Sequence, residues 1–259
     1  MNILRLEING GPATVDQLAY PAIVNYGHFT AMQVRSSAVR GLRLHLARLD
    51  SATRELFGLG LDGGLVREYI RHALGAGILD ASVRVGVFQE DSGEPPSIMV
   101  VLRPPGQQPS VPQRLTAVSY HRPVAQIKHV GTFGQIYHGE AAERAGYDDA
   151  LITGPGDVIS ETTISNIGFF DGDAVVWPSV PSLEGITMQL VSTALAERGI
   201  PSRRNTIRVA DLPSFRSVFL TNSLGVAPVR QVDEQILFID PGFTRDVVDA
   251  YESVPWDQI

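Results

Sequence analysis

The chain has 259 residues, of which 44% are hydrophobic and 19% are charged, a composition typical of folded globular proteins. Its net charge of −7 argues against a broad nucleic-acid surface, so we expect no nucleic-acid partner. It contains no cysteine, which excludes disulfides and thiolate metal sites. The histidines have no ligand spacing, and we expect no metal.

The first residues lack the long apolar core of a secretion signal. No apolar run approaches the roughly 18 residues that a membrane span requires. We therefore expect a cytoplasmic protein without a membrane partner.

The first part of the chain alternates short strand and helix patterns. Leu42, Leu46, Leu49 and Leu56 fall on one face at helical spacing, and Gly58 follows as a stop signal. The patterns predict extended segments at 2–7 and 22–34, helices at 41–58 and 65–74, and strands at 82–88 and 97–102.

Residues 103–113 contain four prolines and one glycine and are typical of a linker. They divide the chain into a small N-terminal domain of residues 1–104, a linker of residues 105–113 and a larger domain of residues 114–259.

The second part mixes short strands and helices without regular alternation, which favours an α+β arrangement. Its helix at 187–198 ends before Gly199. The predicted strands are 114–120, 150–153, 158–160, 167–170, 174–177 and 217–221, and the predicted helices are 134–145 and 187–198.

Lysine usage is the most informative count. Of 21 basic residues only Lys128 is a lysine. Arginine replaces lysine for charge, but it cannot supply a nucleophilic primary amine. Ile127 and Val130 flank Lys128, and their burial would favour the neutral amine. The alternative is an ordinary surface lysine whose stem covers apolar surface.

Three polar segments follow in the second part. Glu161 ends a strand. If its carboxylate is buried, it needs a cationic partner. The alternative is that Glu161 lies in a solvated hairpin turn. Gly185, Ile186 and Thr187 open a helix, where free N–H groups suit a phosphate. Asn222 and Ser223 end a strand in polar side chains.

Arg48 lies on the flank of the leucine face in the first part. An arginine there is placed to bind phosphate through two hydrogen bonds. The alternative is a salt bridge on the helix surface.

Taken in order, these segments resemble the class IV aminotransferases, the fold-type IV pyridoxal-phosphate (PLP) enzymes. That family includes branched-chain and D-amino-acid aminotransferases and aminodeoxychorismate lyase. The resemblance covers nearly the whole chain, and its motifs are Tyr26–Thr30, His45–Leu49, Lys128–Leu151, Glu161–Asn166, Leu183–Thr187 and Thr221–Val229.

The resemblance implies a two-domain fold with a cofactor cleft between a small α+β domain and a PLP-binding mixed α/β domain. Lys128 would hold PLP covalently and move protons, and Glu161 would pair with the pyridine nitrogen. Leu183 would pack on the ring. The phosphate contacts would come from Arg48, from the Ile186 and Thr187 amides, and from Ser223 or Asn222, and Gly185 would also belong to the cofactor site.

Two residues depart from the family pattern. Thr162 replaces the usual glycine after Glu161, and Phe133 stands where many members have a tyrosine that bonds the ring hydroxyl. Tyr137, one turn further on, could replace that tyrosine. Phe29, Ala31 and Gln33, with Arg35 further away, share the strand face that the family turns toward substrate.

The leading hypothesis is transfer of an amino group between an amino acid and a 2-oxo acid. Phe29, Thr30 and residues 127–129 look closer to the lyase pattern, so a lyase that releases pyruvate is the alternative. A binding protein without catalysis is a third hypothesis, which retention of Lys128 opposes. The family further implies a homodimer, with residues 82–94 as candidates for the partner's contribution.

Overall fold

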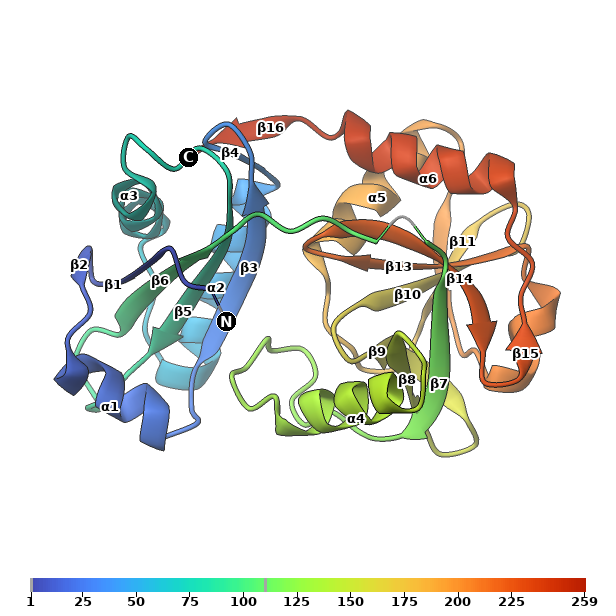
Figure 1. Cartoon of the computed structure of the whole chain (residues 1–259), viewed down its shortest axis with the longest axis horizontal. Helices are drawn as coiled ribbons and strands as arrows, with labels where there is room; N and C mark the ends of the chain where they lie inside the picture. Colours follow the sequence, from blue (N-terminus) through green and yellow to red (C-terminus); the bar gives the residue numbers. More distant parts are fainter. Residues whose placement is uncertain (1, 110) are drawn as a thin grey trace. The chain divides into compact units, whose positions relative to one another are not determined.

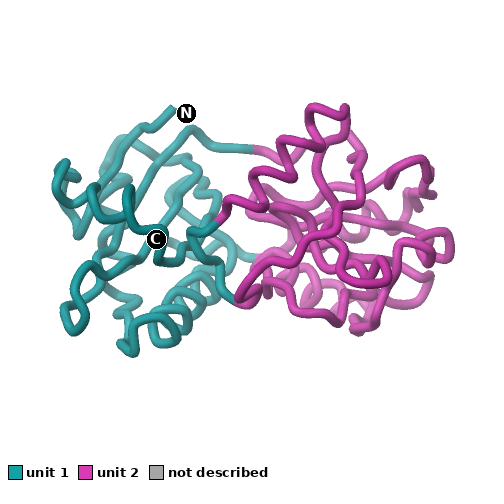
Figure 2. Tube along the Cα trace, turned by 90° about the horizontal axis from the view of Figure 1, so that it is seen from below, with its two compact units in different colours: residues 1–106, 127–131, 255–259 teal, residues 107–126, 132–254 magenta. Residues whose placement is uncertain are grey.

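The computed structural model describes residues 2–109 and 111–259, which form two compact units. Unit 1 contains residues 2–106, 127–131 and 255–259, and unit 2 contains the described part of 107–126 together with 132–254 (Figure 2). Two short segments distant in sequence therefore belong to unit 1.

Unit 1 is an antiparallel sheet packed against helices, with strand order β2-β1-β6-β5-β3. A small β4–β16 ribbon completes it. Its strands are β1 (Arg5–Ile8), β2 (Gly11–Pro12), β3 (His28–Val34), β4 (Ala38–Arg40), β5 (Ala81–Phe88), β6 (Ser97–Arg103) and β16 (Trp256–Gln258), and its helices are α1 (Val15–Ile23), α2 (Leu42–Phe57) and α3 (Gly63–Leu74).

Strand alternation divides the residues of β3 between the two faces of this sheet. Met32 and Val34 join the apolar core that α2 and α3 cover. Phe29, Ala31 and Gln33 point to the opposite face, where they pair in register with Gly86, Arg84 and Ser82 of β5.

Strand β3 is the edge strand of this sheet, and residues 127–131 pair with that edge. Phe29 N donates to Lys128 O at 2.9 Å, and Val130 N donates to Gly27 O at 3.0 Å. The sequence partition assigned this segment to the second domain, and backbone pairing across the edge explains the difference.

Unit 2 contains a nine-stranded mixed sheet with the path β12-β11-β10-β13-β14-β7-β8-β9 and β15 beside β14. Pairs β14–β7, β7–β8 and β11–β12 are parallel. The strands are β7 (Gln113–Ser119), β8 (Asp149–Gly154), β9 (Val158–Thr162), β10 (Asn166–Phe170), β11 (Val175–Pro178), β12 (Ser202–Asn205), β13 (Ser217–Asn222), β14 (Gly225–Val232) and β15 (Gln235–Ile236).

The helices of unit 2 are α4 (Phe133–Arg144), α5 (Ile186–Glu197), the 3-10 helix η1 (Val209–Ser214) and α6 (Pro241–Ser253). Helix α4 packs along β7 and β8, whereas α5 and α6 pack together against β13 and β14 (Figure 1). Alternate residues of β13 enter two apolar clusters, Val218 and Leu220 in one and Phe219 in the other.

The mixed α and β class is confirmed, but some elements differ from the sequence prediction. Residues 22–34 are not one extended segment, because α1 continues to Ile23. Thr14 and Gln17 form a capping box that starts this helix. Helix α6, begun by Asp240 and Pro241, was not predicted at all.

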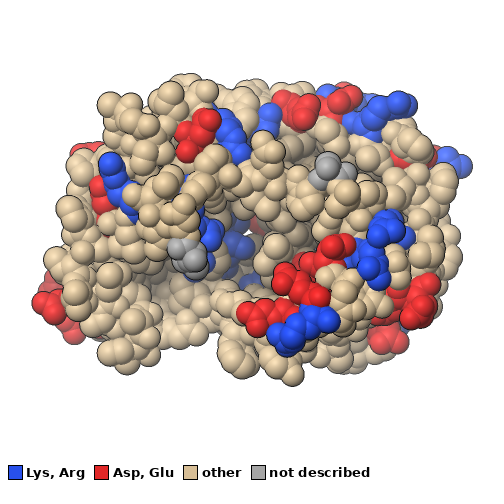
Figure 3. All heavy atoms as spheres, in the orientation of Figure 1, with Lys and Arg blue, Asp and Glu red and all other residues tan. Residues whose placement is uncertain are grey.

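Acidic and basic side chains lie next to one another on the face of unit 2 seen in Figure 3. On α4, Arg144 and Glu140 form an exposed ion pair. Among residues 2–109 and 111–259, no helix has both the length and the apolar character that a membrane span needs.

Candidate active site

Lys128 is half-buried beside the ring of Phe29 in unit 1. Its Nζ atom lies 5.0 Å from the ring centroid, and the Arg84 guanidinium carbon lies 3.5 Å from the same centroid. The edge pairing with β3 fixes the backbone of Lys128, so the chain's one lysine has a defined position against this face.

Arg48 extends from α2 toward the core side of β3. Its Nη2 donates to Thr30 Oγ1, which lies 2.7 Å from His45 Nδ1. Burial lowers the pKa of Arg48 to about 10. Burial, and then the charges of Arg48 and Lys128, hold the pKa of His45 well below its usual range.

The Nε atom of Arg48 is buried and has no hydrogen-bond partner among the described residues. An unpartnered buried donor on a cation is costly unless an acceptor reaches it. The guanidinium is therefore suited to bind an anion that accepts a hydrogen bond from this Nε atom.

Glu161, at the end of β9, is buried in unit 2 against a buried arginine that the sequence prediction missed. Arg122 Nε donates to Glu161 Oε1 at 2.8 Å, and the two side chains are 6% and 9% exposed. Arg122 Nη2 also donates to Ala125 O. The cationic partner expected for a buried Glu161 is thus present within unit 2.

The loop before α5 is tied to this carboxylate. Leu183 N donates to Glu161 Oε2 at 3.3 Å, and Asn166 Nδ2 donates to Leu183 O at 2.7 Å. Gly185 is required here, because a Cβ at that position would collide with Asn166 Oδ1. Glu161 and Asn166 therefore fix the backbone that leads into α5.

Helix α5 begins after Gly185, which has no side chain to cap it, and its first internal bond runs from Gln189 N to Gly185 O. The N–H groups of Ile186 and Thr187 precede that bond, as at any helix start. Thr187 Oγ1 donates to Asn222 O at 2.6 Å, which joins this helix start to the end of β13.

The end of β13 differs in detail from the prediction. The Asn222 side chain donates to Ser165 Oγ at 2.9 Å and accepts from Leu224 N at 2.8 Å. Ser223 is half-buried. Thr221 Oγ1, which the prediction did not single out, is buried without a partner among the described residues. Strand alternation places the side chains of Thr221 and Asn222 on opposite faces of β13, and this was the sequence signal that could have singled out Thr221.

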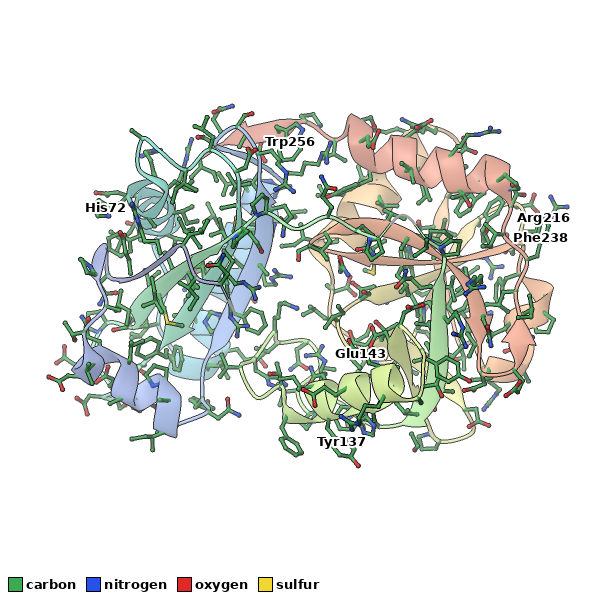
Figure 4. The ribbon with its side chains drawn as sticks, in the orientation of Figure 1. His72, Tyr137, Glu143, Arg216, Phe238 and Trp256 are labelled. Atoms are coloured by element: carbon green, nitrogen blue, oxygen red, sulfur yellow. The ribbon has the colours of Figure 1, made fainter. Side chains whose placement is uncertain are left out.

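The remaining expected residues have other surroundings. Gln33 accepts a hydrogen bond from Gly106 N and donates one to Ser82 Oγ. Its amide therefore links β3 to β5 and to the segment that follows β6. Phe133 is 80% exposed and stacks on Tyr137. Figure 4 shows Tyr137 on the side of α4 that faces away from the sheet, and it contacts Phe133 and His138.

The candidate residues thus form two groups. Lys128, Phe29 and Arg48 lie in unit 1. In unit 2, hydrogen bonds join the segments that carry Glu161, Leu183, Thr187 and Asn222.

The model of the amino-transferase class IV family matches residues 27–232. No curated protein matches the chain. Solved structures that share its fold include two aminotransferases and a lyase.

A branched-chain aminotransferase from Thermoproteus uzoniensis with norvaline has a TM-score of 0.84 at 18% identity, over 97% of this chain and 94% of that one. A hypothetical aminotransferase from Mycobacterium tuberculosis with PLP bound has a TM-score of 0.80 at 18% identity, over 91% and 90%. A proposed 4-amino-4-deoxychorismate lyase from Legionella pneumophila has a TM-score of 0.81 at 20% identity, over 90% and 93%.

The chain therefore belongs to the class IV aminotransferase family. As a member of this family it is a PLP-dependent aminotransferase. The solved structures share the fold-type IV architecture that the sequence predicted.

The side chains present fit the cofactor. A phosphate accepts hydrogen bonds, and within unit 2 the Thr221 hydroxyl and the N–H groups at the start of α5 are donors of that kind. Within unit 1, Arg48 Nε is a donor of the same kind. A pyridinium nitrogen needs a carboxylate, and Glu161 supplies one whose orientation is fixed. Lys128 supplies the primary amine.

Replacing Arg122 tests how far Glu161 depends on it. In Arg122→Met the carboxylate keeps its burial but loses its cation, so the free energy of unfolding should fall by about 3–5 kcal/mol in urea titrations. Arg144→Met breaks an exposed ion pair on α4 and should cost less than about 1 kcal/mol. Equal losses in the two variants would contradict the assigned role of Arg122.

Proposed function

We propose that the chain moves an amino group between an amino acid and a 2-oxo acid, with PLP attached to Lys128 and its pyridine nitrogen paired with Glu161. The observation that carries this proposal is the double tie of Leu183 to Glu161 and Asn166. That tie sets the carboxylate and the free N–H groups of α5 in one fixed frame. PLP needs both, one at each end of the molecule.

The phosphate contacts follow from the assignment made on the sequence and from two side-chain donors without a partner among the described residues, Arg48 Nε and Thr221 Oγ1. We assign them to Arg48, to the backbone of Gly185, Ile186 and Thr187, and to Ser223, and we add Thr221. Asn222 would act less directly, because Ser165 and Leu224 already engage its side chain. Leu183, fixed through its backbone, would pack on the ring.

PLP, when bound, stabilises negative charge that develops on the substrate's α-carbon. The chain's residues must prepare that chemistry. The Lys128 amine is the group that can attach the cofactor and then carry a proton. Glu161, which Arg122 holds in place through Oε1, would accept a hydrogen bond from the ring nitrogen and so hold the proton there.

The substrate would meet the sheet face that carries Phe29 and Ala31. Two basic side chains, Arg84 and Lys128, lie near the buried ring of Phe29, which favours an anionic substrate at this face. Gln33 stays a candidate for donor selection, although its amide is bonded to Gly106 and Ser82. Tyr137, exposed on α4, gains no support as a ring-hydroxyl contact.

Lys128→Arg keeps the charge and removes the primary amine. We expect no cofactor fixed to the chain by borohydride, as read by mass spectrometry of peptides, and no turnover. The double variant Lys128→Arg/Arg144→Lys restores one lysine at an exposed site and should remain unlabelled. Labelling of Lys128→Arg itself would show that the attachment point is wrong.

The reaction is tested by a screen of amino donors with pyruvate and 2-oxoglutarate as acceptors. Transamination requires both partners, so product should depend on the acceptor. In a parallel assay on aminodeoxychorismate, a lyase would release pyruvate without any acceptor. Pyruvate release with no acceptor dependence, absent in Lys128→Arg, would replace the aminotransferase by the lyase alternative suggested by Phe29 and Thr30.

We further propose a cytoplasmic homodimer. Phe133, Ile136 and Tyr137 are 80%, 56% and 56% exposed at helical spacing on α4, an apolar stripe suited to a second copy. Light scattering should give twice the mass of one chain, and Phe133→Asp/Tyr137→Asp should lower it. A monomer with full activity would contradict the dimer.

A further inference from the structure

A chain of three polar residues, the half-buried Arg48 and the buried Thr30 and His45, crosses the core side of unit 1. Thr30 has no exposed surface and His45 is 4% exposed. Both stand among apolar residues of β3 and α2 such as Met32 and Leu49. Polar groups so placed are costly unless each hydrogen finds an acceptor.

The direction of the hydrogens follows from chemistry. A guanidinium only donates, so Thr30 Oγ1 must accept from Arg48. The hydroxyl hydrogen of Thr30 then needs an acceptor, and His45 Nδ1 lies 2.7 Å away. His45 is therefore neutral, with its proton on Nε2, and every bond in the chain points from Arg48 to His45.

A charged His45 would break this arrangement. Protonated Nδ1 would donate to Thr30, so two donors would face one oxygen and the hydroxyl hydrogen would lose its acceptor. It would also add a second cation near Arg48. The low pKa of His45, caused first by burial and then by Arg48 and Lys128, agrees with the neutral form.

We propose that Thr30 and neutral His45 are positioning residues that orient the Arg48 guanidinium and keep its Nε open for the cofactor phosphate. With Nη2 bonded to Thr30, the guanidinium plane cannot rotate freely. The donor without a partner, Nε, then has a fixed direction. This inference rests on the proposed role of Arg48.

The test compares two ligands of the apoprotein, PLP and pyridoxal, which lacks the phosphate. Thr30→Val keeps the shape of Thr30 and removes the oxygen. We expect its PLP dissociation constant to rise about tenfold, as loss of a hydrogen bond to a charged group would give. Pyridoxal binding should stay within about twofold of wild type, and Thr30→Ser should restore PLP affinity.

Thr53→Val is the matched control. Thr53 is a buried threonine of α2 whose hydroxyl lies 2.9 Å from His28 Nε2 and donates to Leu49 O. Its loss removes a comparable buried hydrogen bond away from the Arg48 chain, so PLP affinity should stay within about twofold. An equal loss of PLP affinity in Thr53→Val and Thr30→Val would show a general core defect and overturn the proposal.

The other end of the chain gives an independent test that serves even if Thr30→Val does not fold. In His45→Asn the amide oxygen can accept from Thr30 where Nδ1 did, so PLP affinity should stay close to wild type. His45→Leu removes the acceptor and should weaken PLP about tenfold. Equal PLP affinity in these two variants would overturn the proposal.

A double-mutant cycle separates this inference from the proposed function. In an Arg48→Met background, Thr30→Val should weaken PLP no further, because the group that it orients is gone. The same tenfold loss without Arg48 would overturn the positioning role alone. A wild-type chain that binds PLP no better than pyridoxal would overturn the phosphate role of Arg48, and this inference with it.

Discussion

The buried ion pair between Arg122 and Glu161 is the constraint on which the site in unit 2 depends. A carboxylate this deep cannot stay ionised without a cation close by. Arg122 supplies one through Nε and uses Nη2 to hold Ala125. Because Glu161 uses its second oxygen to bind Leu183, the position of the carboxylate also sets the loop into α5.

The two units handle buried charge in opposite ways. Unit 2 neutralises its buried anion with its own arginine. In unit 1, Arg48 bonds to a hydroxyl, and its charge adds to burial in lowering the pKa of His28 to about 4. Unit 1 therefore carries a buried cation whose bonded partner is neutral.

The sequence predicted those parts of the site that depend on residue type and local order. The single lysine, the strand-ending Glu161 and the helix start at Gly185 could all be recognised locally, and they led to the family that the comparison confirmed. Helix α1 was missed although Thr14 and Gln17 carry its capping signal, because Pro21 lies inside the helix and argues against one.

Long-range partners could not be predicted from local pattern. Arg122 lies 39 residues before Glu161, in a segment without periodicity that could reveal burial. The edge pairing that takes residues 127–131 into unit 1 depends on the free side of β3, which no local motif marks. Strand alternation did predict that Phe29 and Thr30 point to opposite faces of the sheet. The sequence does not show that Arg48 and His45 are the hydrogen-bond partners of Thr30, because both come from a different element.

The core of unit 1 contains several buried polar side chains, and their hydrogen bonds show which groups have a partner. His28 donates to Thr53, whose own hydrogen goes to Leu49 O, and Thr30 satisfies both Arg48 and His45. Beside these bonded groups, Arg48 Nε is a buried donor that has no partner among the described residues. A core built for stability alone would gain from replacing such a cation by apolar side chains. An anion that bonds this one atom removes the deficit in the folded state only, so binding and the stability of unit 1 are coupled by mass action. If that anion is the cofactor phosphate, as proposed above, the atom that weakens the empty fold would be the one that the phosphate stabilises.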